Sequence, residues 1–139
     1  MKSKVKFFRG DAINLVNIIS KFKINGVQLK SVMALLALKS EFVKLATESR
    51  EYLNQTIEQL KPDNFEEVKE DPEVIKAINE QYAPIEFAYL NEEVEIEAES
   101  INVEDLFKMV QGNKDTELLV FELLKNKIGE KEDGNSDKE

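Results

Sequence analysis

Residues 31–60, SVMALLALKSEFVKLATESREYLNQTIEQL, dominate the architecture that we expect for this chain. Their apolar side chains recur mostly three or four positions apart, which is the spacing of an amphipathic helix. These residues are Val32, Leu35, Leu36, Phe42, Val43, Ala46, Leu53, Ile57 and Leu60. At about 1.5 Å per residue such a helix spans about 45 Å, which exceeds the width of a small domain. We therefore predict one long central helix along which shorter elements pack.

A helical hairpin is predicted at the carboxyl end of the long helix. Pro62 ends that helix, and residues 63–70 are acidic and irregular, with room for one loose turn. Asp71 and Pro72 then make a helix start, a capping residue followed by proline at the first helical position. The next helix is apolar with a period near 3.5, at Val74, Ile75, Ile78, Tyr82, Ile85 and Tyr89. This pattern favours an antiparallel hairpin with the long helix, and Pro84 is expected to kink or divide the second helix.

Two segments far apart in the chain alternate between charged and other residues, as half-buried strands do. The first has a row of lysines and the second a row of glutamates: Lys2, Lys4 and Lys6 against Glu93, Glu95, Glu97 and Glu99. Between them lie Val5 and Phe7 in the first segment, and Val94 and Ile96 in the second. Opposite charges across two strands stabilise their pairing by a few tenths of a kcal/mol each. We predict a two-stranded sheet, with antiparallel pairing as the favoured arrangement and parallel pairing left open.

The remaining helices have their own start and stop signals. We predict a helix at 11–22 capped by Asp11, a turn at Asn25 and Gly26, a helix at 103–111 capped by Asn102, and a last helix from Asp115 or Thr116 to Gly129. Residues 129–139 contain no apolar side chain, which predicts a disordered acidic tail. The expected fold is a mainly helical α+β domain over residues 1–128, in the order β-α-α-α-β-α-α.

The residue types that are missing limit the chemistry of this chain. Histidine, cysteine and tryptophan are absent. A Ser-His-Asp triad, a thiol nucleophile and a conventional zinc site are therefore excluded, and we expect no enzyme, no metal and no cofactor. No apolar run approaches the roughly 20 residues that cross a bilayer, and no signal-peptide pattern is present. We expect an intracellular protein without membrane contact.

The net charge of −9 is unevenly distributed along the chain. Residues 1–50 hold ten basic and three acidic side chains, whereas the remaining residues hold nine basic and 25 acidic ones. Either the two parts pack together and neutralise each other, or a basic face stays free for a nucleic acid or an acidic partner. Because the chain as a whole is acidic, nucleic-acid binding is not our default expectation.

Two groups of side chains are candidate partner-binding residues. The first lies off the main apolar stripe of the long helix: Leu38, Leu45 and Tyr52. These side chains are either ordinary core or a contact surface for a second copy or a partner helix. The second is a group of acids beyond Pro62: Glu66, Glu67, Glu70, Asp71 and Glu73. Carboxylates spaced along a helix can occupy phosphate positions in a basic cleft, although acidic surfaces also serve solubility alone.

Residues 90–96, LNEEVEI, are the most distinctive stretch of the chain, preceded by INE at 78–80 and followed by ELL at 122–124. Together with the amino-terminal strand and the long charged helix, they resemble a group of small acidic proteins of tailed bacteriophages that has no assigned function. The likeness covers most of residues 4–128. The chain departs from the group at 26–31, where GVQLKS replaces a turn like Gly-Lys-Ser-Arg. The resemblance implies a phage setting and transfers no catalytic residue.

These observations predict a non-catalytic phage protein that acts through protein–protein contacts, in particle assembly or as a virion accessory. The long helix and the acidic tip of the hairpin would make the contacts, with a protein partner or with a second copy. The alternative is a free inhibitor or modulator of a host protein that presents an acidic, DNA-like surface. The expected location is the host cytoplasm or the virion.

Overall fold

The computed structural model describes residues 2–111 and 117–130 of the chain. Its elements are strand β1 (Lys2–Phe8), helices α1 (Arg9–Ile19), α2 (Leu29–Leu60), α3 (Phe65–Val68) and α4 (Pro72–Leu90), strand β2 (Glu93–Glu99), and helices α5 (Val103–Val110) and α6 (Glu117–Ile128). This is the mainly helical α+β fold predicted from the sequence. The one-turn helix α3 corresponds to the loose turn expected within 63–70.

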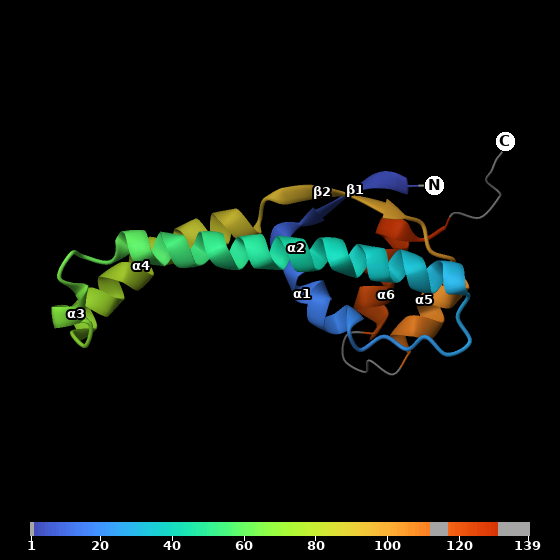
Figure 1. Cartoon of the computed structure of the whole chain (residues 1–139), viewed down its shortest axis with the longest axis horizontal. Helices are drawn as coiled ribbons and strands as arrows, with labels where there is room; N and C mark the ends of the chain where they lie inside the picture. The colour runs from blue at the N-terminus through green and yellow to red at the C-terminus, as the bar shows by residue number, and fades with distance from the viewer. Residues whose placement is uncertain (1, 112–116, 131–139) are drawn as a thin grey trace.

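Helix α2 runs the length of the molecule and connects a base to a projecting arm (Figure 1). The base consists of β1, β2, α1, α5, α6 and the first half of α2. The arm consists of the second half of α2, the antiparallel α4 and, at the far end, α3 (Figure 1). At about 1.5 Å per residue, α2 is about 48 Å long. The long helix and the helical hairpin predicted from the sequence are both confirmed.

Strands β1 and β2 pair antiparallel, with the register that their complementary charges predict. Each lysine on the exposed face lies opposite a glutamate: Lys2 opposite Glu99, Lys4 opposite Glu97, and Lys6 opposite Glu95. The other face carries the apolar pairs Val5 with Ile96 and Phe7 with Val94. The side chain of Lys4 also approaches Glu95, the diagonal neighbour of its partner Glu97, with 3.9 Å between Nζ of Lys4 and Oε1 of Glu95. The sheet therefore has one charged face and one face that packs on the core.

The core of the base lies between the sheet, the first half of α2 and the helices α1, α5 and α6. Phe7 extends from β1 to Phe42 of α2, with the two rings edge to face and their centroids 5.0 Å apart. Both rings are buried, as are Leu106 and Met109 of α5. Because each aromatic side chain removes about 150–250 Å² from water, this pair fixes α2 against the sheet.

Helix α1 begins two residues earlier than predicted and ends at Ile19 instead of Phe22. The chain passes directly from β1 into α1, and Asp11 lies in the first turn and not at the capping position. The backbone N–H of Arg9 donates to the carbonyl of Glu92 at 2.9 Å, so hydrogen bonding continues from the sheet into the helix. A side chain at Gly10 would place its Cβ 3.3 Å from the carbonyl oxygen of Leu90. Gly10 therefore permits the close approach of α1 to the end of α4, a tertiary role that the local sequence does not indicate.

Four side chains join the base to the arm. The guanidinium of Arg9 lies 3.9 Å from the ring centroid of Tyr89. It donates hydrogen bonds to the carbonyl of Tyr89 at 3.1 Å and to the carboxylate of Glu92 at 2.6 Å. The ring of Tyr89 in turn stacks on Tyr52 of α2, with 4.3 Å between centroids. This cluster, which we call the Arg9 joint, connects α1, α2 and α4 at the point where the arm leaves the base.

Helix α4 begins at the predicted signal. The backbone N–H of Glu73 donates to the carboxylate of Asp71 at 3.0 Å, and Pro72 occupies the first helical position. The helix then continues through Pro84 to Leu90, so Pro84 does not divide it. Ile78 is the most buried apolar side chain of α4 and marks the side that packs on α2.

A buried polar contact attaches α5 to α2. The side chain of Asn102 accepts a hydrogen bond from the backbone N–H of Asp105 at 3.1 Å, which confirms the predicted cap. The hydroxyl of Ser31 donates to the carboxylate of Asp105 at 2.6 Å, and both side chains are buried. A buried carboxylate is costly unless it accepts hydrogen bonds, and Ser31 provides one.

The ordered chain extends beyond the predicted start of the disordered tail. Gly129 forms an isolated parallel bridge with Ile101, and the N–H of Glu130 donates to the carbonyl of Ile101 at 2.7 Å. The first two residues assigned to the tail are therefore part of the fold. The rest of the predicted tail, 131–139, lies outside the described residues, as does the predicted start of the last helix within 112–116.

Candidate interaction surfaces

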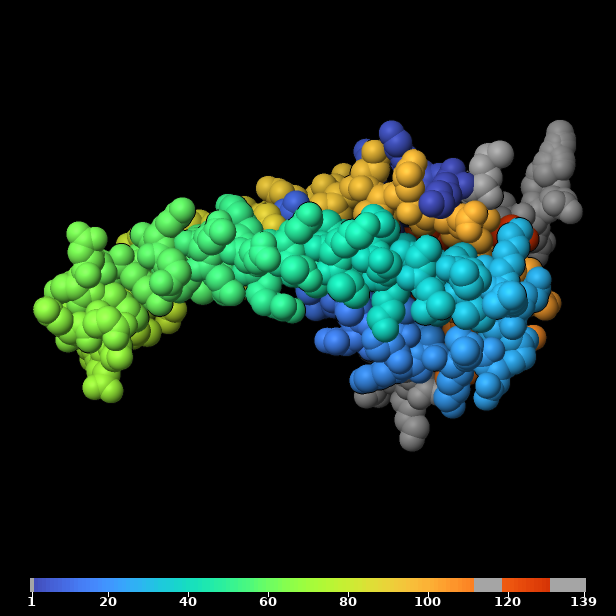
Figure 2. Space-filling model, in the orientation of Figure 1, coloured from blue at the N-terminus to red at the C-terminus, as the bar shows by residue number. Residues whose placement is uncertain are grey.

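An apolar stripe on the first half of α2 points away from the core of the base. It consists of Leu29, Met33, Leu36 and Val43, whose exposed fractions are 75%, 58%, 54% and 41%. We call these four residues the α2 stripe. Their spacings of three, four and seven place them on one side of the helix, opposite the buried Leu38 and Phe42. In Figure 2 the first half of α2 lies uncovered along one face of the molecule. Contiguous exposed apolar side chains of this kind mark contact surfaces, whereas single ones are common.

The stripe is confined to the base. Beyond it, the same side of α2 carries the exposed polar residues Glu51, Asn54 and Glu58. This side of α2 is therefore polar in the arm. The exposed apolar side chains on this side are confined to the first half of the helix.

Lysines border the stripe. Lys30, Lys39 and Lys44 lie within the same segment of α2, and Glu41 is its acidic residue. Lys44 pairs with Glu41 across one turn at 3.3 Å. Within residues 2–111 and 117–130, neither Lys30 nor Lys39 forms an ion pair. The stripe thus carries a positive border that is available to an acidic partner.

The three residues predicted to lie off the main stripe make contacts within the chain. Leu38 is 1% exposed in the core, and Leu45 packs half-buried against the core. Tyr52 belongs to the Arg9 joint through its stacking on Tyr89. For these residues the structure supports the tertiary alternative. By contrast, Leu36 and Val43, which the sequence pattern assigns to the main stripe, are the exposed ones.

The predicted acidic group lies at the end of the arm, on α3 and the start of α4. All five of its members are exposed, and we call them the acidic tip: Glu66, Glu67, Glu70, Asp71 and Glu73. Lys69 pairs with Glu66 at 3.0 Å, and Asp71 caps α4, so part of this charge is used locally. The structure brings the predicted residues together, partly on the four-residue helix α3 and partly around the start of α4.

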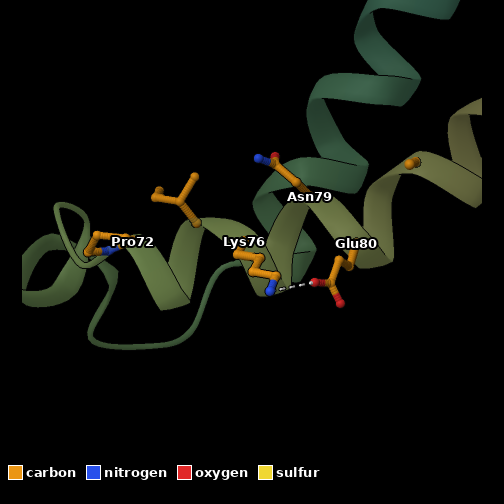
Figure 3. Close-up of a pocket in the computed structure, with 6 residues that line it drawn as sticks. Pro72, Lys76, Asn79 and Glu80 are labelled. Atoms are coloured by element: carbon orange, nitrogen blue, oxygen red, sulfur yellow. Dashed lines mark ion pairs between the residues drawn. The ribbon is translucent and has the colours of Figure 1, made fainter.

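A shallow depression lies on α4 beside the acidic tip (Figure 3). Its lining residues are Pro72, Ile75, Lys76, Asn79, Glu80 and Ala83. Lys76 Nζ lies 3.9 Å from Glu80 Oε1 and the two form one edge of the depression. One turn beyond Ala83 is Phe87, which is 71% exposed. We call Pro72, Ile75, Ala83 and Phe87 the α4 face. Ile75 lies one turn from Ile78, at the edge of the side that packs on α2, whereas Pro72, Ala83 and Phe87 lie farther round the helix.

A second depression lies between α1 and α6. Its lining residues are Asp11, Asn14, Leu15, Ile18, Leu119, Val120 and Leu123. One carboxylate and one amide are the polar side chains among them. Asp11 is the one ionisable side chain among these lining residues, so no ionisable groups converge there.

Across the described parts of the chain, no three acidic side chains converge to hold a metal ion. Burial raises the pKa of Tyr82 above its usual value of 10.0, and the hydrogen bond to the carboxylate of Glu86 and the negative charge of that group add to the effect. A raised pKa keeps the phenol protonated near neutral pH, where it is a poor base or nucleophile.

No protein-family model, curated protein or solved structure matches this chain. In addition, none of the described helices is both long enough and apolar enough to cross a membrane. The surfaces of the described residues that bear on function are the α2 stripe, the acidic tip and the α4 face.

Proposed function

We propose that this chain is a non-catalytic phage protein that binds other protein subunits, in particle assembly or as a virion accessory. The α2 stripe is the observation that carries the proposal. Covering exposed apolar surface contributes about 25 cal/mol per Å², so four large side chains on one helix face favour association. A helix of a partner laid along the stripe would bury them at helical spacing. The phage setting, in the host cytoplasm or the virion, rests on the sequence resemblance alone.

The arm supports a role in connecting partners. Because α2 is continuous from the base to the tip, the stripe and the acidic end of the arm stand at opposite ends of one helix. The Arg9 joint holds the arm in one direction relative to the base. One chain can therefore present two separate contact surfaces at a defined distance.

A second candidate function is inhibition or modulation of a host protein by an acidic, DNA-like surface. The exposed acids at the end of the arm favour it, because a basic cleft would attract them at long range. The two functions depend on different residues. Replacing Glu67 and Glu70 with glutamine would abolish binding by mimicry and leave the apolar side chains of the α2 stripe unchanged.

Site-specific photo-crosslinking tests the lead function. A photoreactive phenylalanine analogue replaces Leu36 in the stripe, and in a matched control it replaces Leu119, which is 74% exposed on α6. Both chains are irradiated in the cells that naturally make this protein. We expect discrete protein adducts from position 36 that are absent from position 119. Equal adducts from both positions, or none from position 36, would contradict a docking role for the stripe.

A further inference from the structure

We infer that the α2 stripe binds the α4 face of a second copy of this chain, so that copies associate head to tail. This inference rests on the proposed function, because it names the partner of the same stripe. Three properties of the two surfaces support it: their charge, their length and their positions in the fold.

The two surfaces are complementary in charge. Residues 29–47, which carry the stripe, hold three lysines and one glutamate. Residues 63–80, which carry the tip and the first part of the α4 face, hold seven acids and two lysines. Two stripes facing each other would bring like charges together, whereas a stripe facing the α4 face brings opposite charges together. Such complementarity selects partners and orients their encounter.

The two surfaces also match in length and form. The stripe extends over 14 residue steps from Leu29 to Val43, or about 21 Å along its helix. The α4 face extends over 15 steps from Pro72 to Phe87, or about 22 Å. The stripe presents four large apolar side chains on one side of its helix, and the α4 face presents Ile75 and Phe87 together with the smaller Pro72 and Ala83. Two such helices can lie side by side with their apolar faces in contact at 8–10 Å between axes, a separation typical of packed helices.

The fold prevents one chain from joining its own two surfaces. Within a chain, α4 packs against the second half of α2 through the side that includes Ile78. The residues of the α4 face stay exposed beside that contact, and the stripe lies on the first half of α2, in the base. Only another molecule can therefore cover either surface. An interface between two different surfaces of identical chains is heterologous, and it generates a ring or an open helical filament.

Complementation between two variants tests this arrangement by analytical ultracentrifugation. Leu36→Glu removes the stripe and keeps the α4 face, whereas Phe87→Glu does the reverse. Both positions are more than half exposed, so the fold should persist, and circular dichroism melting checks that it does. We expect the wild-type chain to associate and each variant alone to sediment as a monomer of 16.0 kDa. An equal mixture of the two should form a dimer of twice that mass and nothing larger. The control Leu119→Glu should associate like the wild type.

The other outcomes overturn the inference in distinguishable ways. A Phe87→Glu chain that still dimerises, beside a monomeric Leu36→Glu chain, would mean that two stripes bind each other. A mixture that stays monomeric while the wild type associates would exclude the α4 face as the partner. A wild-type chain that is monomeric at every concentration would exclude self-association. In that last case, adducts from position 36 to a different protein would still support the proposed function. If those adducts were also absent, both the head-to-tail inference and the proposed function would be contradicted.

Discussion

Removing the guanidinium of Arg9 should loosen the connection between base and arm and destabilise the protein by about 2 kcal/mol. The side chain is 16% exposed and makes three contacts, to the ring and carbonyl of Tyr89 and to the carboxylate of Glu92. A cation over an aromatic face contributes about 0.5–2 kcal/mol, depending on its burial. A hydrogen bond to a charged group contributes about 1.5–3 kcal/mol, and less where solvent reaches the pair. Glu92 is 58% exposed, so we place the sum for Arg9→Ala near the lower end of these ranges.

Urea unfolding followed by circular dichroism measures this loss as a free energy of unfolding. Arg50→Ala is the matched control, because Arg50 lies exposed on α2 and takes part in none of these contacts. That control should change stability by less than about 0.5 kcal/mol, as exposed surface substitutions usually do. Arg9→Lys should keep part of the attraction to Glu92 and lose the planar stacking on Tyr89, which gives an intermediate loss. Equal effects of Arg9→Ala and Arg50→Ala would refute the role of the joint.

Three further predictions concern the base and α4. Glu95→Lys should lower stability by a few tenths of a kcal/mol, and adding Lys4→Glu should restore part of the loss; a coupling of zero in this double-mutant cycle would contradict the charge pairing of the strands. Phe42→Ala should cost about 3–5 kcal/mol in urea unfolding because its ring is fully buried against Phe7, and a cost below 1 kcal/mol would exclude this packing. Since the pKa of Tyr82 is raised in the folded chain, its contribution is present below the unfolded pKa of about 10 and is lost as pH rises through the folded pKa. Tyr82→Phe should therefore reduce the fall in stability between pH 9 and pH 11, and an unchanged slope would contradict the shift.

The strand pairing could be predicted from the sequence because both segments alternate with period two and carry opposite charges. A register shifted by one residue would bury lysines and expose Phe7, so one alignment is strongly preferred. The start of α4 was equally predictable, because the signal of Asp71 and Pro72 is local. The acidic tip followed from the same stretch, since its residues are neighbours in the sequence.

The α2 stripe could not be identified from the sequence, because apolar residues surround the first half of α2 on all sides. Leu35 and Leu36 are adjacent, yet one is buried and the other is half exposed. The choice depends on where the sheet and α5 lie, through contacts such as Phe7 with Phe42 and Ser31 with Asp105. The buried Ser31 was a usable signal in retrospect, since a polar side chain with a distant buried partner indicates the inward side of a helix. The close approach at Gly10 likewise depends on Leu90, which is 80 residues away.

The absolute mass of the wild-type chain in solution tests the central claim most directly. Light scattering over a concentration series, at low and at high salt, gives this mass without assumptions about shape. We predict a mass above 16.0 kDa that rises with concentration. High salt should reduce the association without abolishing it, because the Debye length falls from about 10 Å at 0.1 M to about 3 Å at 1 M while the apolar contact persists. A mass of 16.0 kDa at every concentration and both salts would contradict head-to-tail association through the α2 stripe.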